Sequence, residues 1–188
     1  MKSARTLIIC LLMQAGASHL LCAQPQTLVG LNLTTERSSG RDLIPGIGLT
    51  VDRQLSRHSG ISSGLYYRTF LRGWYAQTPV GLYTFTVSER FLYLPLTYTY
   101  YTRWVHLAAG LTFEHYTGWR QRDDGTVTVQ SYSMDPVYTL GLLLKVSRQI
   151  ALSRQLCLEP ELRFNPLFSE YRSYWGIGLQ LKYRLPGR

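Results

Sequence analysis

The sequence predicts an all-β protein, an eight-stranded antiparallel up-and-down transmembrane β-barrel. Three observations point to this fold. Apolar side chains recur at every second position in many segments, the connections between these segments alternate between long and short, and aromatic residues gather where the segments end. Period-two alternation is a strand signal, and the other two features are typical of barrels that cross a bilayer.

Eight segments carry the alternation. The first two are the weaker ones, and the eight lie near residues 27–35, 44–55, 61–71, 92–98, 105–113, 138–147, 157–168 and 175–185. Within 157–168, Leu158, Leu162 and Phe164 share one face. Charged Glu159, Glu161 and Arg163 share the other. In a membrane barrel the apolar face points outward to lipid and the polar face inward.

The connections sort by length in strict order. They span residues 36–43, 56–59, roughly 73–90, 102–103, 118–135, 148–153 and 169–173, long and short in turn. Outer-membrane barrels have short periplasmic turns and longer outer loops. Two long connections contain strand-like stretches, "VGLYTFTV" and "TVTVQSYS". We therefore expect at least one of them to extend its strands above the membrane as a hairpin, where a protein partner can bind by strand addition.

Aromatic residues form two groups that match the interfacial girdles of membrane barrels. One group surrounds the second short turn: Tyr98, Tyr100, Tyr101 and Trp104. The other meets the long connections: Trp74, Tyr75, Tyr116, Trp119, Tyr138, Phe168, Tyr174 and Trp175. A secreted lipocalin-like barrel with an apolar interior is the alternative. It would expose both aromatic belts to water and leave Gly141, Gly176 and Gly178 outside without purpose.

The first 23 residues read as a signal peptide, followed by a barrel domain at 24–188. Lys2 and Arg5 precede a short apolar stretch, and cleavage is expected after Ala23, with Ala17 as the competing site. Cleavage would lower the formal net charge from +9 to +7. It would also leave Cys157 as the lone cysteine, so no intrachain disulfide can form.

The inward-facing charges are expected to form an ionic network that plugs the barrel. Its predicted members are Asp52, Arg68, Glu114, Lys145, Glu159, Glu161, Arg163, Lys182 and Arg184. Eight strands leave a space that side chains fill, and an unpaired charge there costs several kcal/mol. Glu159 and Glu161 should therefore reach Lys182 and Gln180 on the last strand.

Arginines in or beside the long connections are candidates for contacts with lipopolysaccharide phosphates through charge-assisted hydrogen bonds. They are Arg37, Arg41, Arg72, Arg120 and Arg122. A solvated loop explains them equally well. The basic balance does not indicate nucleic acid, because a secreted membrane barrel does not meet it.

Catalytic signals are weak, and we expect no enzyme activity, cofactor or metal. His115 and Thr117 share one strand face, as in barrels that trim lipid A, but Glu114 points to the opposite face. A rim histidine and threonine at the headgroup level is the simpler interpretation. Asp123-Asp124-Gly125 reads as a turn, because Asp-Gly favours hairpins.

Several strands resemble those of the PorT-like and OmpX-like outer-membrane β-barrel families. The matching stretches are "GLNLTT", "GIGLTVDRQL", "SSGLYYRTF", "RFLYLPLTYTYY", "VHLAAGLTFEHY" and "GIGLQLKYRL". The core Tyr93–Leu96 is the most specific piece. The end departs from the pattern, because the chain runs on through Pro186 to Arg188 instead of stopping at an aromatic residue.

The resemblance implies an outer-membrane location more than an activity. The leading expectation is a monomeric structural or interaction barrel that displays its loops to a protein partner and contacts outer-membrane lipid. An accessory component of a secretion or envelope machine, as in the PorT-like family, is the alternative. A lipid A-modifying barrel is the third.

Overall fold

The computed structural model describes residues 26–38, 43–78, 81–122, 137–168 and 173–186. The predicted signal peptide and the Asp123-Asp124-Gly125 turn lie outside these ranges. Among the described residues, no helix is long and apolar enough to cross a bilayer.

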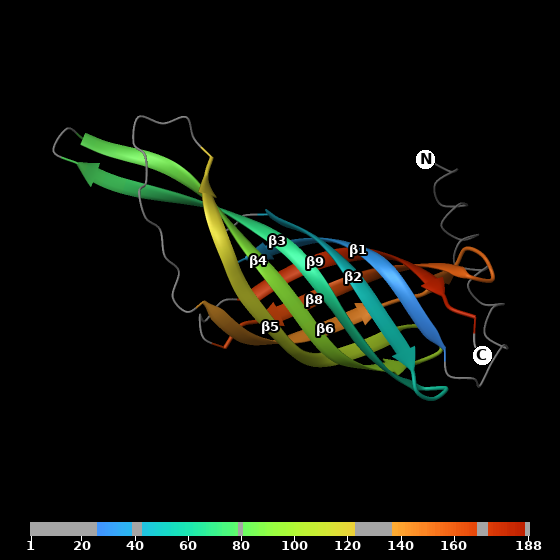
Figure 1. Ribbon diagram of the computed structural model, residues 1–188. Helices are drawn as coiled ribbons and strands as arrows, with labels where there is room; N and C mark the ends of the chain where they lie inside the picture. The colour runs from blue at the N-terminus through green and yellow to red at the C-terminus, as the bar shows by residue number, and fades with distance from the viewer. Residues whose placement is uncertain (1–25, 39–42, 79–80, 123–136, 169–172, 187–188) are drawn as a thin grey trace, which may run out of the picture.

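Nine antiparallel strands form one sheet that closes on itself (Figure 1). They are β1 (Thr27–Ser38), β2 (Leu43–Gln54), β3 (Ser59–Thr78), β4 (Gly81–Tyr101), β5 (His106–Gln121), β6 (Tyr138–Ser147), β7 (Ile150–Ala151), β8 (Leu156–Pro166) and β9 (Ser173–Arg184). Neighbours in sequence pair around the ring, β1 pairs with β9, and the β6–β8 pairing closes the wall.

The two-residue β7 continues β6 across a short break. The backbone N–H of Arg148 donates to the carbonyl of Pro160 at 3.2 Å, and Ile150 then pairs with Leu158 in the same register. Eight strands therefore make the wall, which confirms the predicted eight-stranded up-and-down barrel.

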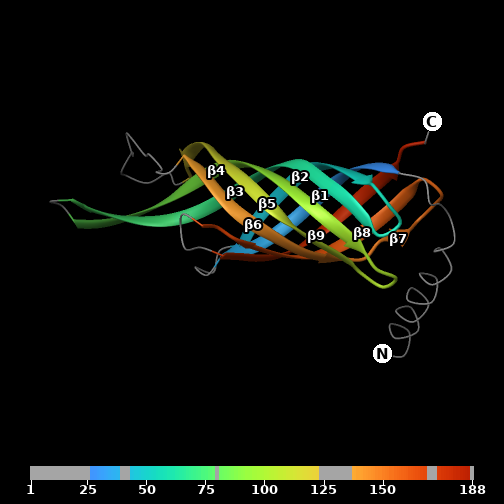
Figure 2. The same ribbon diagram turned by 90° about the horizontal axis from the view of Figure 1, so that it is seen from below.

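The strands are strongly staggered. Following paired residues once around the wall from Thr27 ends ten residues further along β1, by way of Arg53, Ile61, Tyr98, Ala109, Leu144, Phe164, Trp175 and finally Arg37. A closed sheet with such a stagger must tilt its strands relative to the barrel axis, as Figures 1 and 2 show. The stagger decides which inward side chains share a level.

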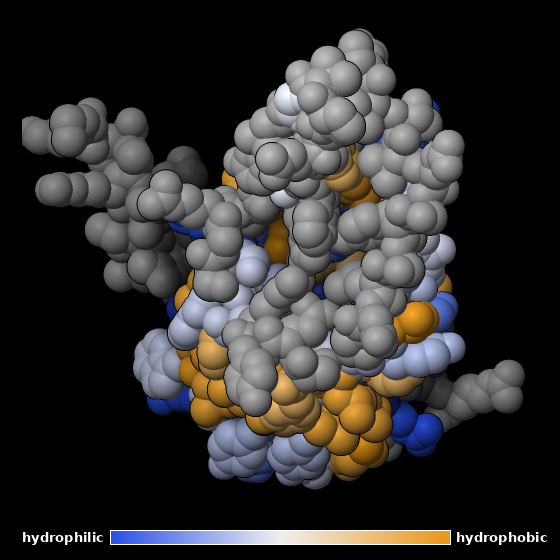
Figure 3. All heavy atoms as spheres, turned by 90° about the vertical axis from the view of Figure 1, so that its left-hand side faces the viewer, coloured by the Kyte–Doolittle hydropathy of each residue, from blue (hydrophilic) through white to orange (hydrophobic). Residues whose placement is uncertain are grey.

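Side chains alternate between a polar interior and an apolar exterior. On β8, Glu161 and Arg163 are each 3% exposed, whereas Leu162 between them is 62% exposed. Hydrophobic residues lie on the outer flank of the barrel in Figure 3. A continuous apolar exterior of this kind is unfavourable in water and favourable against the acyl chains of a bilayer. The lipocalin-like alternative is wrong, because its interior would be apolar.

The two ends of the barrel differ. Three tight turns close one end, with hydrogen bonds from Ser56 to Ser59, Thr102 to Val105 and Ser153 to Leu156. The two described chain ends meet there as well, since the N–H of Leu185 donates to Thr27 (Figure 2). We call this the short-turn end and the opposite one the long-loop end.

At the long-loop end, β3 and β4 run on together as a projecting hairpin (Figure 1). They pair as far as Thr78 and Gly81, whereas β2 pairs with β3 only up to Arg68, and β5 pairs with β4 only up to Val87. The expected hairpin thus forms from the 73–90 connection. The central part of the 118–135 connection lies outside the described residues.

Candidate functional site

The lumen is filled by charged side chains that meet from different strands. Nearest the short-turn end, Lys182 of β9 lies between two carboxylates. Its Nζ is 2.6 Å from Oε2 of Glu159 on β8, and it also ion-pairs with Asp52 on β2. The hydroxyl of Ser147 donates to Glu159 at 2.6 Å. All four side chains are buried.

The middle of the lumen centres on Glu161 of β8. Asn32 of β1 donates to its Oε1 at 2.9 Å, and Gln180 of β9 donates to its Oε2. Lys145 of β6 lies 3.3 Å from the same carboxylate. Three strands on either side of β8 therefore each bring a polar side chain to this one buried acid.

Two arginines extend the network towards the long-loop end. Arg68 of β3 lies between Glu36, at 2.5 Å, and Glu114, at 2.6 Å. Arg163 of β8 is 3.4 Å from Glu36 and 3.6 Å from Glu161. It therefore connects the contacts around Arg68 with those around Glu161. Its Nη2 also donates to the Tyr93 hydroxyl at 3.2 Å. The guanidinium of Arg68 lies 4.4 Å from the Tyr93 ring centre, a cation–π contact.

An apolar cluster closes the lumen beyond Arg68. Its members are Ile44, Phe70, Phe91, Leu167 and Tyr174, with Tyr116 packed against them. Phe70 meets Phe91 edge to face at 4.9 Å and Tyr174 at 5.5 Å. Tyr174 was expected in the outer girdle, and that expectation is wrong, because it is 2% exposed and points inward, while the next residue, Trp175, points outward.

Eight of the nine predicted lumen residues lie buried inside the barrel: Asp52, Arg68, Glu114, Lys145, Glu159, Glu161, Arg163 and Lys182. Arg184 does not join them. It is half-buried where β9 ends, and its Nη1 lies 3.5 Å from the Arg154 carbonyl. Among the described residues it makes no ion pair.

Two buried acids were not among the residues predicted to face the lumen. Glu36 is 3% exposed and central to the network, and Glu89 is fully buried on β4. Both fell in predicted connections, because the residues around them do not alternate between apolar and polar. For Glu36 the available signal was its place in the alternation, since Asn32, Thr34 and Glu36 occupy every second position of β1 and so face the same side.

The lipopolysaccharide candidates are spread over the long-loop end. Arg37, Arg120 and Arg122 are exposed there, Arg37 beside Trp175 in the β1–β9 pairing. Arg41 lies outside the described residues, as does the side chain of Arg72.

The residues of the lipid A-trimming hypothesis do not meet. The His115 ring stacks on Tyr138 on the outer wall at 4.7 Å, and the Thr117 hydroxyl donates to the Arg90 carbonyl at 3.1 Å. Glu114 is buried inside the barrel against Arg68. No cluster of possible metal ligands occurs in the described part of the chain.

No family model matches the chain, and no curated protein sequence does. Solved structures do share its fold. OprG, an outer membrane protein of Pseudomonas aeruginosa, has a TM-score of 0.53 at 10% identity, covering 88% of this chain and 97% of that one. Neisserial surface protein A has a TM-score of 0.51 at 11% identity, covering 86% and 97%. The Ail protein of Yersinia pestis scores 0.47 at 12% identity, covering 88% and 100%.

At such identities OprG and neisserial surface protein A show the fold of this chain and no more. A shared barrel fold and an exterior that needs lipid together make this chain an outer-membrane β-barrel. The architecture agrees with the OmpX-like resemblance, whereas the PorT-like resemblance stays a prediction.

Proposed function

We propose that the protein is a sealed, monomeric barrel that serves the cell envelope as a structural or interaction module. The filled lumen carries this proposal. Ion pairs run from Lys182 near the short-turn end to Arg68 near the long-loop end, and the apolar cluster lies beyond. A permeating ion would have to separate buried pairs, which costs several kcal/mol each. A pore function is therefore disfavoured.

The projecting β3–β4 hairpin supports an interaction role. Beyond Arg68, β3 has no hydrogen-bonded neighbour on its β2 side among the described residues. A strand edge of this kind offers backbone donors and acceptors to another chain. The hairpin thus provides a docking edge that the barrel wall, being closed, does not.

Shortening the hairpin tests this role. Replacing residues 73–86 by a two-residue turn should leave a barrel that inserts and still changes its gel mobility on boiling. Photo-crosslinks placed at Leu71 should then lose the adducts that they give in the full-length protein. A crosslinker at Leu152, at the other end, is the matched control. Unchanged adducts at Leu71 would contradict the interaction role.

An accessory role in a secretion or envelope machine is a second candidate, which the same hairpin favours. It differs by one outcome: the protein should then co-purify in mild detergent with a defined set of envelope subunits. Recovery as a lone barrel would favour the simpler module.

We propose no catalytic role. The three residues that suggested one each have a structural contact, with Tyr138 for His115, Arg90 for Thr117 and Arg68 for Glu114. Deleting the protein should leave the lipid A mass spectrum unchanged. A mass shift would support the enzyme instead.

Lipopolysaccharide is a proposed contact of the exposed arginines at the long-loop end. Guanidinium groups pair well with phosphate, and Arg37, Arg120 and Arg122 are exposed. Replacing all three by glutamine should weaken lipopolysaccharide binding in detergent. Equal binding would leave them as solvated charges.

A further inference from the structure

We propose that the short-turn end binds the phosphate headgroups of anionic phospholipids through a ring of arginines. This surface is separate from the lumen network and does not depend on the proposed function. Its members, which we call the short-turn arginines, are Arg53, Arg57, Arg103, Arg148 and Arg154. Arg53, Arg57, Arg103 and Arg154 are exposed, and Arg148 is half-buried.

Two of these arginines end columns of lipid-facing side chains. On β2 the outward positions are apolar from Ile47 through Val51, and the next outward position is Arg53. On β6 the outward column ends with Val146, and the next position on that side is Arg148. A guanidinium placed there lies where acyl chains give way to headgroups, which is where long basic side chains extend to find phosphate.

The three tight turns each combine an arginine with an exposed apolar residue. Leu55 precedes Arg57, and Leu152 precedes Arg154; both leucines are exposed. In the β4–β5 turn the Arg103 guanidinium lies 5.3 Å from the ring centre of exposed Trp104. An apolar group beside a cation suits the membrane interface, where one part enters the acyl region and the other meets headgroup charge.

No acid of the described chain balances these charges. All six described acids are buried: Glu36, Asp52, Glu89, Glu114, Glu159 and Glu161. The other five acids of the sequence fall between strands that meet at the long-loop end, at positions 42, 123, 124, 135 and 170. Within the described residues, none of the short-turn arginines makes an ion pair. The counter-charge must therefore come from outside the described chain.

The arrangement favours lipid over an acidic protein. The arginines come from β2, from all three tight turns and from the end of β6, so they are distributed around the barrel. Arg53 and Arg148 are on the wall, which a partner docking on the end of the barrel would not reach. A leaflet surrounds the barrel at this level and meets every one of them.

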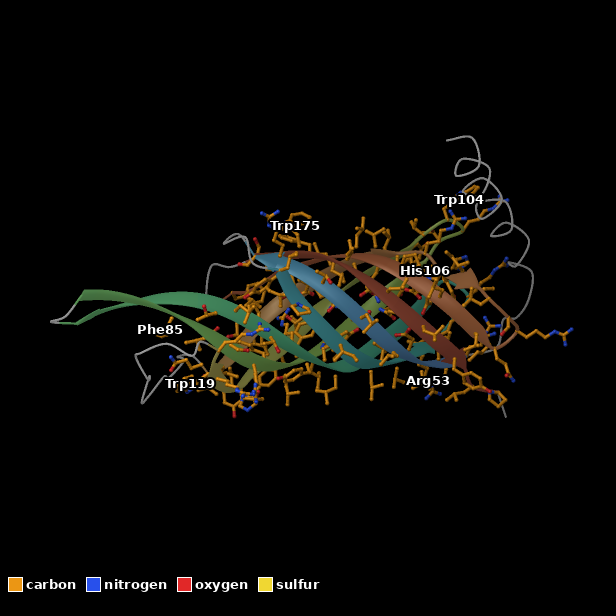
Figure 4. All side chains as sticks on the ribbon, turned by 90° about the horizontal axis from the view of Figure 1, so that it is seen from above. Arg53, Phe85, Trp104, His106, Trp119 and Trp175 are labelled. Carbon is orange, nitrogen blue, oxygen red and sulfur yellow. The ribbon has the colours of Figure 1, made fainter. Side chains whose placement is uncertain are left out.

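Trp104 provides a local reporter. Figure 4 shows it at the short-turn end, with Trp119 and Trp175 at the other, and Trp74 lies in the projecting hairpin. The hydrogen bond from Tyr101 N–H to the His58 carbonyl, at 2.9 Å, holds the Trp104 turn beside the Arg57 turn. Replacing the other three tryptophans by phenylalanine leaves one fluorophore beside the arginines.

This single-tryptophan protein is reconstituted into phosphatidylcholine vesicles that contain brominated phosphatidylglycerol or, separately, brominated phosphatidylcholine. Bromine quenches Trp104 only when the lipid is adjacent, so the two titrations give a relative binding constant. We expect a preference for phosphatidylglycerol of about threefold or more, because each basic residue near a membrane surface attracts anionic lipid. The R53Q/R57Q/R148Q variant should bring the ratio to about one, leaving Arg103 beside the reporter untouched.

The matched control is R37Q/R120Q/R122Q, which removes the same charge at the long-loop end and should keep the preference. Equal quenching by the two lipids in the parent protein would overturn the proposal. So would a full preference in the short-turn variant, or an equal loss in the control, which would show a bulk charge effect. No lipid preference, with a Trp104 emission shift on adding soluble polyglutamate, would assign the surface to an acidic protein instead.

Discussion

Lys182 and Glu159 form an ion pair of 2.6 Å in the interior of a barrel whose exterior is apolar. Asp52 contacts the same ammonium from β2. Arg68 and Arg163 are likewise each shared between two carboxylates. Such sharing links strands that do not pair directly in the sheet, and removing one charge leaves a buried partner only partly compensated.

Replacing Glu159 and Glu161 together by glutamine should destabilise the barrel. Both carboxylates are buried. Without them Lys145 would lose its ion-pair partner Glu161, and Lys182 would keep only Asp52. Loss of one partner of a buried pair costs about 3–5 kcal/mol. Urea unfolding in lipid should show a loss of at least about 3 kcal/mol for the double variant.

The control for this experiment is R120Q/R122Q, which removes two exposed charges at the long-loop end in lipid that contains no lipopolysaccharide. It should change stability by no more than about 0.5 kcal/mol per site. A double glutamine variant as stable as the control would mean that the buried pairs do not stabilise the fold.

Gly178 leaves the space that Glu161 occupies. A Cβ at this position would lie 2.7 Å from Cγ of Glu161, too close for real atoms. Gly178→Ala should therefore displace the carboxylate and cost about 1–3 kcal/mol. Gly73→Ala is the matched control, since nothing lies within 4 Å of its Cβ. Equal unfolding curves would show that the lumen is loosely packed there.

Orientation can be read by cysteine labelling in a Cys157→Ser background. The long-loop end should face outward, so a cysteine at Gly81 should react with a membrane-impermeant maleimide on intact cells. A cysteine at Ser56, in a tight turn, should react only after lysis. Both proteins should change gel mobility on boiling, as folded membrane barrels do. The reverse labelling pattern would invert the topology.

The sequence predicted the barrel because period-two alternation and connection length are local features. It missed Glu36 and Glu89, because neither lies in an apolar–polar alternation. It also placed Tyr174 outside, because inward and outward aromatic residues look alike at a strand end. The sequence did not predict which charged side chains pair, except for those on neighbouring strands. The hydrogen bond between Arg163 of β8 and Tyr93 of β4 crosses the lumen and depends on closure of the whole sheet, which no short segment displays.

Conductance of the purified protein in a planar bilayer tests the sealed lumen most directly. Insertion is first checked in proteoliposomes by the mobility change on boiling. A lack of current then cannot be due to a lack of inserted protein. The wild type should show little or no steady current, because paired charges and the cluster around Phe70 and Phe91 fill the path. A large, stable, ion-selective conductance would contradict the account and make a porin the leading function.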